Sequence, residues 1–174
     1  MAPWYSVYTR PRHEKHVLKE LNEKHIEAFL PTYKVRRRWS DRYKIVEEPL
    51  FKNYLFVNVD YDRRYYDTLR PYGAVSFVSF DGTPAMIPAE EIEAIRRLVT
   101  CELPYSPHPY LKVGRKVRVR FGPLAGCEGI LVRKKSLSRL VLSVNLLQQA
   151  VSAEIDADCE GALKCLSDRC ARPN

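Results

Sequence analysis

The sequence predicts an α+β N-terminal domain, an antiparallel sheet with packed helices, followed by a small β-barrel. Three observations lead to this prediction. Residues 1–100 alternate between strand-like and helix-like apolar patterns in the order β-α-β-β-α-β-α. Residues 101–111 carry prolines at positions 104, 107 and 109, which is typical of a stiff, extended linker. Residues 113–156 consist of short β-type runs separated by glycines, with little helical periodicity.

The first strand and the first helix follow from residue patterns near the N-terminus. Residues 4–9 alternate and are rich in aromatic and β-branched side chains, as in a half-buried strand. After Pro11, apolar residues recur near one face of a predicted helix, while Lys and Glu occupy the other face. These apolar residues are Val17, Leu18, Leu21 and Ile26.

The next strand signals lie between residues 28 and 59. Residues 28–35 predict a second strand, in which Pro31 indicates an edge position or a bulge. Residues 36–44 are charged and predict an exposed loop or hairpin tip. Residues 50–59 (LFKNYLFVNV) are the strongest strand signal, and their near-continuous apolar character indicates a central, buried strand.

The rest of the first domain is predicted as helix, strand and helix. Residues 62–70 predict a short helix, and residues 75–80 predict a strand that ends at a turn formed by Asp81 and Gly82. Pro88 opens the last helix, where glutamates occupy the first turn and arginines lie near the end, as the helix dipole favours. The apolar residues with helical spacing in it are Ile92, Ile95 and Leu98.

These elements predict a domain over residues 1–100, a linker over 101–111, a β-barrel over 112–160 and a flexible tail over 161–174. The barrel region is poorly suited to a helical state. A helix over residues 116–134 would enclose three glycines and a proline, which together cost about 6 kcal/mol relative to alanine. These residues are Gly122, Pro123, Gly126 and Gly129.

Composition restricts the class of protein. A net charge of +8, from 29 Lys and Arg against 21 Asp and Glu, favours polyanionic partners. No apolar run approaches the roughly 20 residues that a membrane helix needs, and the N-terminus lacks the apolar core of a signal peptide. We therefore expect a cytoplasmic protein without membrane contacts. Five cysteines, an odd and scattered number, are interpreted as reduced thiols.

The sequence lacks the patterns of common catalytic and metal sites. It has no phosphate-binding glycine loop, no zinc-type CxxC pair and no HExxH motif. Neighbouring glutamates, such as those at positions 47 and 48, point apart and do not form a catalytic pair. We therefore expect no enzymatic activity, no cofactor and no metal ion. An enzyme that uses the cysteine-containing tail has only the thiols in its favour.

Two segments carry a family resemblance. Residues 48–57 (EPLFKNYLFV), together with Trp4-Tyr5 and residues 73–78, resemble the N-terminal (NGN) domain of the NusG transcription factors. Residues 113–120 (VGRKVRVR), with the glycine-containing run that follows them, are similar to a KOW motif, whose domain is an SH3-like barrel. The two segments occur in the family's order, and the resemblance covers about residues 3–160.

Within this family, the chain resembles the operon-specific RfaH and UpxY paralogues. The EPLFKNYLFV form and residues 84–88 (PAMIP) are closer to these paralogues than to general NusG. The resemblance implies a monomeric elongation factor and antiterminator that binds bacterial RNA polymerase, and whose KOW domain recruits ribosomal protein S10 or the termination factor Rho. The alternative is an RNA-binding KOW protein of the ribosomal type, which leaves the N-terminal signature unexplained.

The resemblance also implies contact residues on the first domain. An apolar surface for the polymerase clamp helices would use aromatic side chains, and the region of the gate-loop motif would use Tyr65 and Thr68. For each single aromatic residue, core packing is the competing interpretation. The aromatic residues assigned to the clamp helices are Trp4, Tyr8, Phe51, Tyr54 and Phe56.

A basic run after the first strand predicts contact with the non-template DNA strand. Arg and His side chains bind phosphates and stack on or hydrogen-bond exposed bases, although a solvated helix start is equally compatible. The second basic run, Arg36–Arg38 with Trp39 and Arg42, is either a solvated face or a stacking site for nucleic acid. The residues assigned to DNA are Arg10, Arg12, His13, His16 and Arg70.

Overall fold

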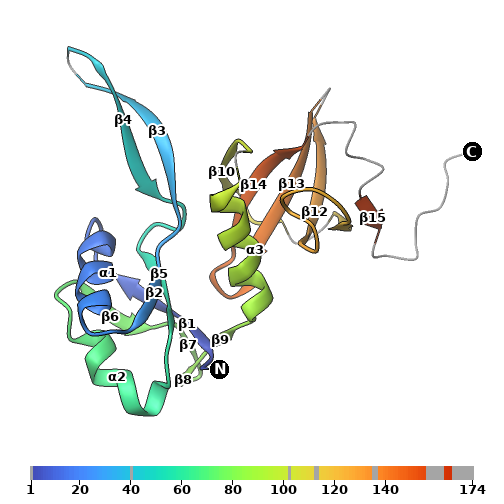
Figure 1. The fold of residues 1–174 in the computed structure, drawn as a ribbon. Helices are drawn as coiled ribbons and strands as arrows, with labels where there is room; N and C mark the ends of the chain where they lie inside the picture. The colour runs from blue at the N-terminus through green and yellow to red at the C-terminus, as the bar shows by residue number, and fades with distance from the viewer. Residues whose placement is uncertain are drawn as a thin grey trace, which may run out of the picture. The chain divides into compact units, whose positions relative to one another are not determined.

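The computed structural model describes residues 2–39, 41–101, 103–111, 114–134, 137–155 and 163–165. The chain divides into two compact units, Met1–Ala89 and Glu90–Asn174, which are described separately below (Figure 1). In the described residues, no helix is long and apolar enough to cross a membrane.

The first unit contains a mixed sheet-and-helix fold with nine strands and two helices among its described residues. Its elements are β1 (Trp4–Thr9), α1 (Glu14–Glu23), β2 (Glu27–Phe29), β3 (Thr32–Arg38), β4 (Tyr43–Pro49), β5 (Tyr54–Asn58), α2 (Tyr61–Leu69), β6 (Ala74–Phe77), β7 (Ser79–Phe80), β8 (Thr83–Pro84) and β9 (Met86–Ile87).

The main sheet of the first unit is antiparallel, in the order β2-β5-β1-β6, and β9 also pairs with β1. β1 lies against β5 with Tyr5 opposite Val57 and Val7 opposite Leu55. Side chains alternate along a strand, so these four residues share one face. They are buried there with residues from α1, and half-buried residues of α2 pack against the same cluster. Both helices therefore cover the face that holds the core.

Of the strands predicted in the first unit, one is shorter than the apolar pattern indicated and another is interrupted. The strand predicted over residues 50–59 is regular only from Tyr54 to Asn58, because Asn53 adopts a positive φ of 67° that ends strand geometry. The strand predicted over residues 28–35 is interrupted at Leu30 and Pro31, which separate β2 from β3. The backbone N–H of Leu50 donates to the carbonyl of Pro31 at 2.9 Å, so the two interruptions lie beside each other.

The charged segment predicted as a loop or hairpin tip is mostly strand. β3 and β4 pair along their whole length, from Thr32 opposite Pro49 to Arg38 opposite Tyr43. They form a two-stranded ribbon that stands out from the rest of the first unit (Figure 1). The backbone N–H of Trp39 donates to the carbonyl of Arg42 at 2.7 Å and closes the turn.

The second unit begins with a helix and continues with an antiparallel sheet. The helix predicted after Pro88 is confirmed as α3. The elements are α3 (Ala89–Thr100), β10 (Tyr105–His108), β11 (Arg115–Val119), β12 (Glu128–Lys134), β13 (Leu137–Val144), a 3₁₀ turn η1 (Asn145–Leu147), β14 (Gln149–Ile155) and β15 (Leu163–Cys165).

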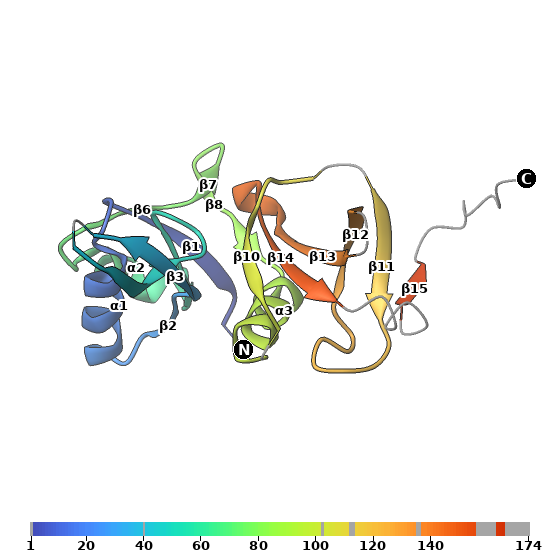
Figure 2. The same ribbon diagram turned by 90° about the horizontal axis from the view of Figure 1, so that it is seen from above.

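The second sheet has six strands in the order β10-β14-β13-β12-β11-β15, and they can be followed in Figure 2. The described residues do not show the predicted SH3-like barrel as a closed sheet, because β10 and β15 at the two ends of this order are not paired with each other there. The segment predicted as a linker contributes β10, which pairs with β14, so its proline at position 107 lies on an edge strand. In the predicted tail, residues 163–165 pair with β11, whereas Cys159 and Cys170 lie outside the described residues.

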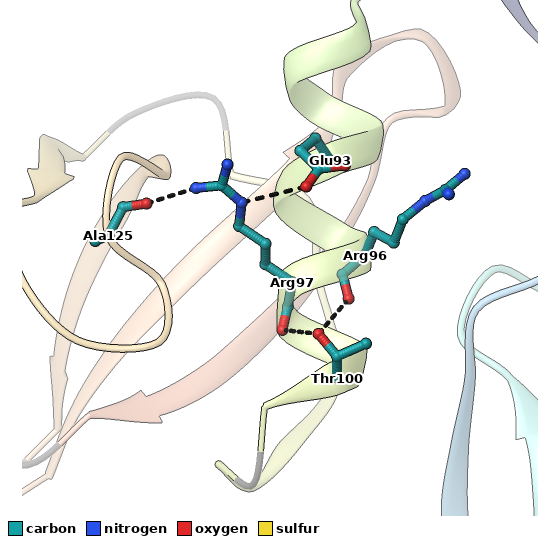
Figure 3. A network of polar contacts seen from close by, with 5 residues as sticks. All are labelled: Glu93, Arg96, Arg97, Thr100 and Ala125. Atoms are coloured by element: carbon teal, nitrogen blue, oxygen red, sulfur yellow. Dashed lines mark hydrogen bonds and ion pairs between the residues drawn. The ribbon is translucent and has the colours of Figure 1, made fainter.

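The helix α3 groups with the second unit, although the predicted boundary at residue 100 places it in the first domain. Two polar contacts join it to the second sheet. The Arg97 guanidinium donates to the carbonyl of Ala125 at 2.7 Å and also contacts Glu93 at 3.3 Å (Figure 3). The side-chain amide of Asn145 donates to Glu91 at 2.6 Å, and burial raises the pKa of that carboxyl. A helix's own periodicity cannot indicate which domain it joins.

Candidate functional site

The aromatic residues predicted to bind a partner separate into an accessible pair and a buried group. Tyr8 and Tyr54 lie directly opposite each other on β1 and β5, and their ring centroids are 5.4 Å apart. The face that carries them is opposite to the one that holds Tyr5 and Val7. Tyr8 is 36% exposed and Tyr54 is half-buried. Tyrosine suits such a partly wet position because one end of its ring is apolar and the other polar.

Phe51 and Phe56 belong to the protein's interior. They are 1% and 0% exposed, and their rings meet edge to face at 5.5 Å. Their predicted role as contact residues is therefore not supported by accessibility, and the core-packing interpretation applies to both. Trp4 lies at the start of β1, opposite Asn58, and is half-buried.

The helix α2 presents a different residue from the ones predicted. Tyr65 packs on Phe77, with a ring distance of 5.8 Å. Thr68 is fully buried, and its hydroxyl donates to the carbonyl of Arg64 at 2.7 Å. Tyr66 is 84% exposed. One residue along a helix rotates the side chain by about 100°, so Tyr65 faces the core and Tyr66 faces away.

Arg10, His13 and Tyr72 form a basic and aromatic cluster, referred to below as the Tyr72 cluster. An Arg10 guanidinium nitrogen lies 3.3 Å from the Tyr72 hydroxyl, and the guanidinium carbon is 5.4 Å from the centre of the ring. The His13 ring meets the Tyr72 ring edge to face at 5.3 Å. Tyr72 was not among the predicted residues. Its one sequence signal is its place before a glycine in the turn Pro71-Tyr72-Gly73.

The backbone holds the Tyr72 cluster together. The N–H of Arg10 donates to the carbonyl of Gly73 at 2.8 Å. Gly73 has a φ of 104°, and a Cβ at this position would lie 2.5 Å from the Cβ of His13. Only glycine allows this close approach of the turn to the loop after β1. Nδ1 of His13 lies 3.0 Å from the Pro11 carbonyl, which can only accept, so Nδ1 carries the hydrogen.

The remaining predicted DNA-binding residues differ in whether an ion pair engages their side chains. Arg12 is exposed and adopts a positive φ of 67° in the loop after β1. Arg70 is exposed at the C-terminal end of α2. His16 is exposed but lies 2.7 Å from Glu20, with which it forms an ion pair when protonated. Arg12 and Arg70 are therefore better placed than His16 to offer positive charge to DNA. Both lie close in the sequence to residues of the Tyr72 cluster.

A buried carboxylate supports the loop that carries the cluster. Glu14, the first residue of α1, is 5% exposed and accepts a hydrogen bond from the N–H of Asn53 at 3.0 Å. The carbonyl of Asn53 in turn accepts from the N–H of Thr9 at 2.7 Å, one residue before Arg10. The loop is therefore fixed from the sheet side as well as from the Gly73 side.

The described residues contain no group of three or more His, Cys, Asp or Glu side chains that could hold a metal ion. Cys101 and Cys127 are free thiols in the described part of the second unit. Burial raises the pKa of the Cys127 thiol.

The comparison with protein families decides the assignment. The family described as "Transcription termination factor nusG" matches residues 2–96, which include both the Tyr8–Tyr54 pair and the Tyr72 cluster. The chain belongs to the NusG family. Members of this family are transcription factors and not enzymes.

Two solved structures extend this comparison. A structure described as "Domain interaction in Thermotoga maritima NusG" is 19% identical, with 96% of this chain and 98% of that chain covered and a TM-score of 0.55. At this identity, the likeness establishes a shared fold. A structure of the MjSpt4:Spt5 complex is 16% identical, with 94% and 98% of the chains covered and a TM-score of 0.25.

Proposed function

We propose that this NusG-family protein is a transcription elongation factor and antiterminator that binds bacterial RNA polymerase in the cytoplasm. The observation that carries the proposal is the Tyr8–Tyr54 pair, two adjacent and accessible aromatic side chains on the sheet of the family-matched region. Exposed aromatic residues are enriched where proteins bind one another.

In this proposal, Tyr8 and Tyr54 contact the clamp helices of the polymerase, and Phe51 and Phe56 support them from the interior. The exposed Tyr66 takes the gate-loop position that the sequence suggested for Tyr65 and Thr68. The competing function, an RNA-binding KOW protein of the ribosomal type, has no use for this aromatic surface.

The Tyr72 cluster is the proposed contact for the non-template DNA strand. Arg10 and His13 offer hydrogen-bond donors beside the Tyr72 ring, and Tyr72 is 63% exposed. Single strands are bound by such combinations of cations and aromatic faces, because every base has a ring face on which to stack. Arg12 and Arg70 add charge that phosphates attract.

The finer assignment to operon-specific paralogues of the RfaH and UpxY type rests on the EPLFKNYLFV and PAMIP segments. We propose that residues 112–160 act as a KOW domain that recruits ribosomal protein S10 or Rho. Strands β11 and β12 and the glycine-containing loop between them support this role, since they coincide with the KOW-like segment.

Binding of core RNA polymerase tests the proposal. The Tyr8→Ala/Tyr54→Ala variant should bind more weakly by about 1–3 kcal/mol, as truncation of interface aromatics does. Phe80→Ala is the matched control, because Phe80 is an exposed aromatic residue on β7 and should leave affinity unchanged. Titration with fluorescently labelled polymerase provides the measurement. Equal affinities of the tyrosine variant and the wild type, with both folded, would refute the polymerase contact.

A further inference from the structure

The β3–β4 ribbon carries a concentration of positive charge that the proposed polymerase and single-strand contacts do not use. Residues 34–46 contain six basic residues and one acidic residue, a net charge of +5. The acidic residues at the base of the ribbon are paired: Glu48 with Arg37 at 2.7 Å, and Glu47 with Lys15 at 3.8 Å. The excess of positive charge therefore lies toward the turn.

The register of the ribbon assigns its cations to two faces. Arg36 lies opposite Ile45 and Arg38 opposite Tyr43, so these four side chains share one face. Arg37 lies on the other face, where two of its nitrogens donate to the two oxygens of Glu48 at 2.7 and 2.9 Å. Among the described residues, Arg36 and Arg38 pair in register with the uncharged Ile45 and Tyr43, so their charge is available to a partner.

Two aromatic rings of the ribbon, those of Trp39 and Tyr43, form cation–π contacts with cations of the ribbon itself. The Arg36 guanidinium lies over the Tyr43 ring at 4.1 Å, and the Lys44 ammonium lies over the Trp39 ring at 5.2 Å. In proteins that bind single strands, open ring faces stack on bases. Here a cation covers one face of each ring, which favours a partner held by its phosphates.

We propose that the β3–β4 ribbon binds B-form duplex DNA through its sugar-phosphate backbone, without reading the sequence. A two-stranded ribbon fits the major groove of B-DNA, which is about 12 Å wide. The major groove of A-form RNA is too narrow for protein side chains. Duplex DNA also presents about one negative charge per 1.7 Å of axis, which matches a row of exposed arginines. Arg36 and Arg38 are the residues that carry this contact.

Anisotropy titrations of the full chain without polymerase test this inference. The probes are a labelled DNA duplex of about 30 base pairs, one of its strands alone, and an RNA duplex of the same sequence. The Arg36→Gln/Arg38→Gln variant should weaken duplex DNA binding by about tenfold at low salt. The slope of log K against log salt should fall by about two, since each phosphate contact contributes about 0.9.

Three control variants identify the source of any loss. Lys19→Gln/Arg64→Gln removes the same charge from α1 and α2 and should change the salt slope by less than about 0.5. Arg37→Gln/Glu48→Gln leaves the net charge of the ribbon unchanged and should bind duplex DNA like the wild type. Arg10→Gln/Arg12→Gln should weaken single-strand binding and retain the ribbon's contribution to duplex binding.

The inference stands apart from the polymerase proposal, because no polymerase is present in the titrations. It is overturned if the Arg36→Gln/Arg38→Gln variant binds duplex DNA like the wild type, or if the Lys19→Gln/Arg64→Gln or Arg10→Gln/Arg12→Gln variant loses as much. It is also overturned if the ribbon substitutions reduce binding of the single strand or the RNA duplex more than that of the DNA duplex. Far-UV circular dichroism verifies that each variant is folded. If the double variant is misfolded, Arg38→Gln alone replaces it, and its slope of log K against log salt should be lower than that of the wild type by about one.

Discussion

The Tyr72 cluster and the β3–β4 ribbon are both basic and aromatic, but they are held in place differently. The cluster is fixed by two long-range hydrogen bonds, from the N–H of Arg10 to the carbonyl of Gly73 and from the N–H of Asn53 to the carboxylate of Glu14. The ribbon is held by pairing between its own two strands, and no third strand pairs with it in the described residues. A site fixed from several sides can present donors in set directions, whereas a ribbon presents a row of charge. The first arrangement suits exposed bases and the second suits a regular polyanion.

The largest expected effect comes from disrupting the close approach of Gly73 to His13 in the Tyr72 cluster. Gly73→Ala places a Cβ 2.5 Å from the Cβ of His13, at a residue with a φ of 104°. We expect the free energy of unfolding to fall by about 3 kcal/mol, from the strained backbone and the overpacking together. Urea denaturation of the full chain provides the measurement.

Gly82→Ala is the matched control for this substitution. Gly82 also has a positive φ, of 77°, but apart from its chain neighbours no described residue has an atom within 4 Å of the position of a new Cβ. Its cost should be about 1–2 kcal/mol, from the backbone alone. Equal losses at Gly73 and Gly82 would mean that the approach of His13 contributes nothing.

A smaller effect is expected from the buried carboxylate below the cluster. Glu14→Ala removes the acceptor for the N–H of Asn53 and leaves that donor unsatisfied. The free energy of unfolding should fall by about 1–3 kcal/mol. Glu23→Ala, which removes an exposed carboxylate from the other end of α1, should change it by less than about 0.5 kcal/mol. If Glu14→Ala lowers the free energy of unfolding as little as Glu23→Ala does, the contact between Glu14 and Asn53 does not stabilise the loop.

The smallest expected effect concerns the ribbon and its dependence on pH. Hydrogen bonds from Arg37 hold the pKa of Glu48 below its ordinary value of 4.5. The stability that this pair contributes is therefore present above the ordinary pKa and is lost as pH falls through the lowered one. In thermal unfolding, wild type and Glu48→Gln should differ at pH 6, and the difference should shrink as the pH falls below 4.5. Glu47→Gln is the control, and a difference that grows as the pH falls below 4.5 would contradict the assignment.

The fold of the first unit could largely be predicted from apolar patterns. The strand at residues 4–9 and the helices after Pro11 and near residue 62 follow their predicted segments closely, except that α1 ends at Glu23, before Ile26. The predictions were weaker where a turn interrupts an apolar run, because an apolar pattern does not reveal a positive φ such as that of Asn53. They also underestimated the ribbon, since charged residues on a two-sided exposed hairpin lack the alternation that signals a strand.

The candidate site was predicted in part. Arg10, Arg12 and His13 could be chosen because a basic run after a strand is visible in the sequence. Tyr72 could not, since it lies 62 residues from Arg10 in the sequence. The backbone hydrogen bond from Arg10 to Gly73 brings their side chains together. Tyr54 and Phe56 lie two residues apart in β5 and share one face, but Tyr54 is partly exposed and Phe56 is fully buried.

By itself, the sequence determined the order of the three helices, the excess of positive charge and the family, because these depend on local pattern and on motifs that are contiguous in the chain. Only the tertiary structure decided which aromatic side chains remain accessible, which unit α3 joins and how Arg10, His13 and Tyr72 meet. The physical reason is that burial and side-chain contact depend on which distant segments pair. A residue's own neighbours in the sequence specify its face and leave open what covers that face.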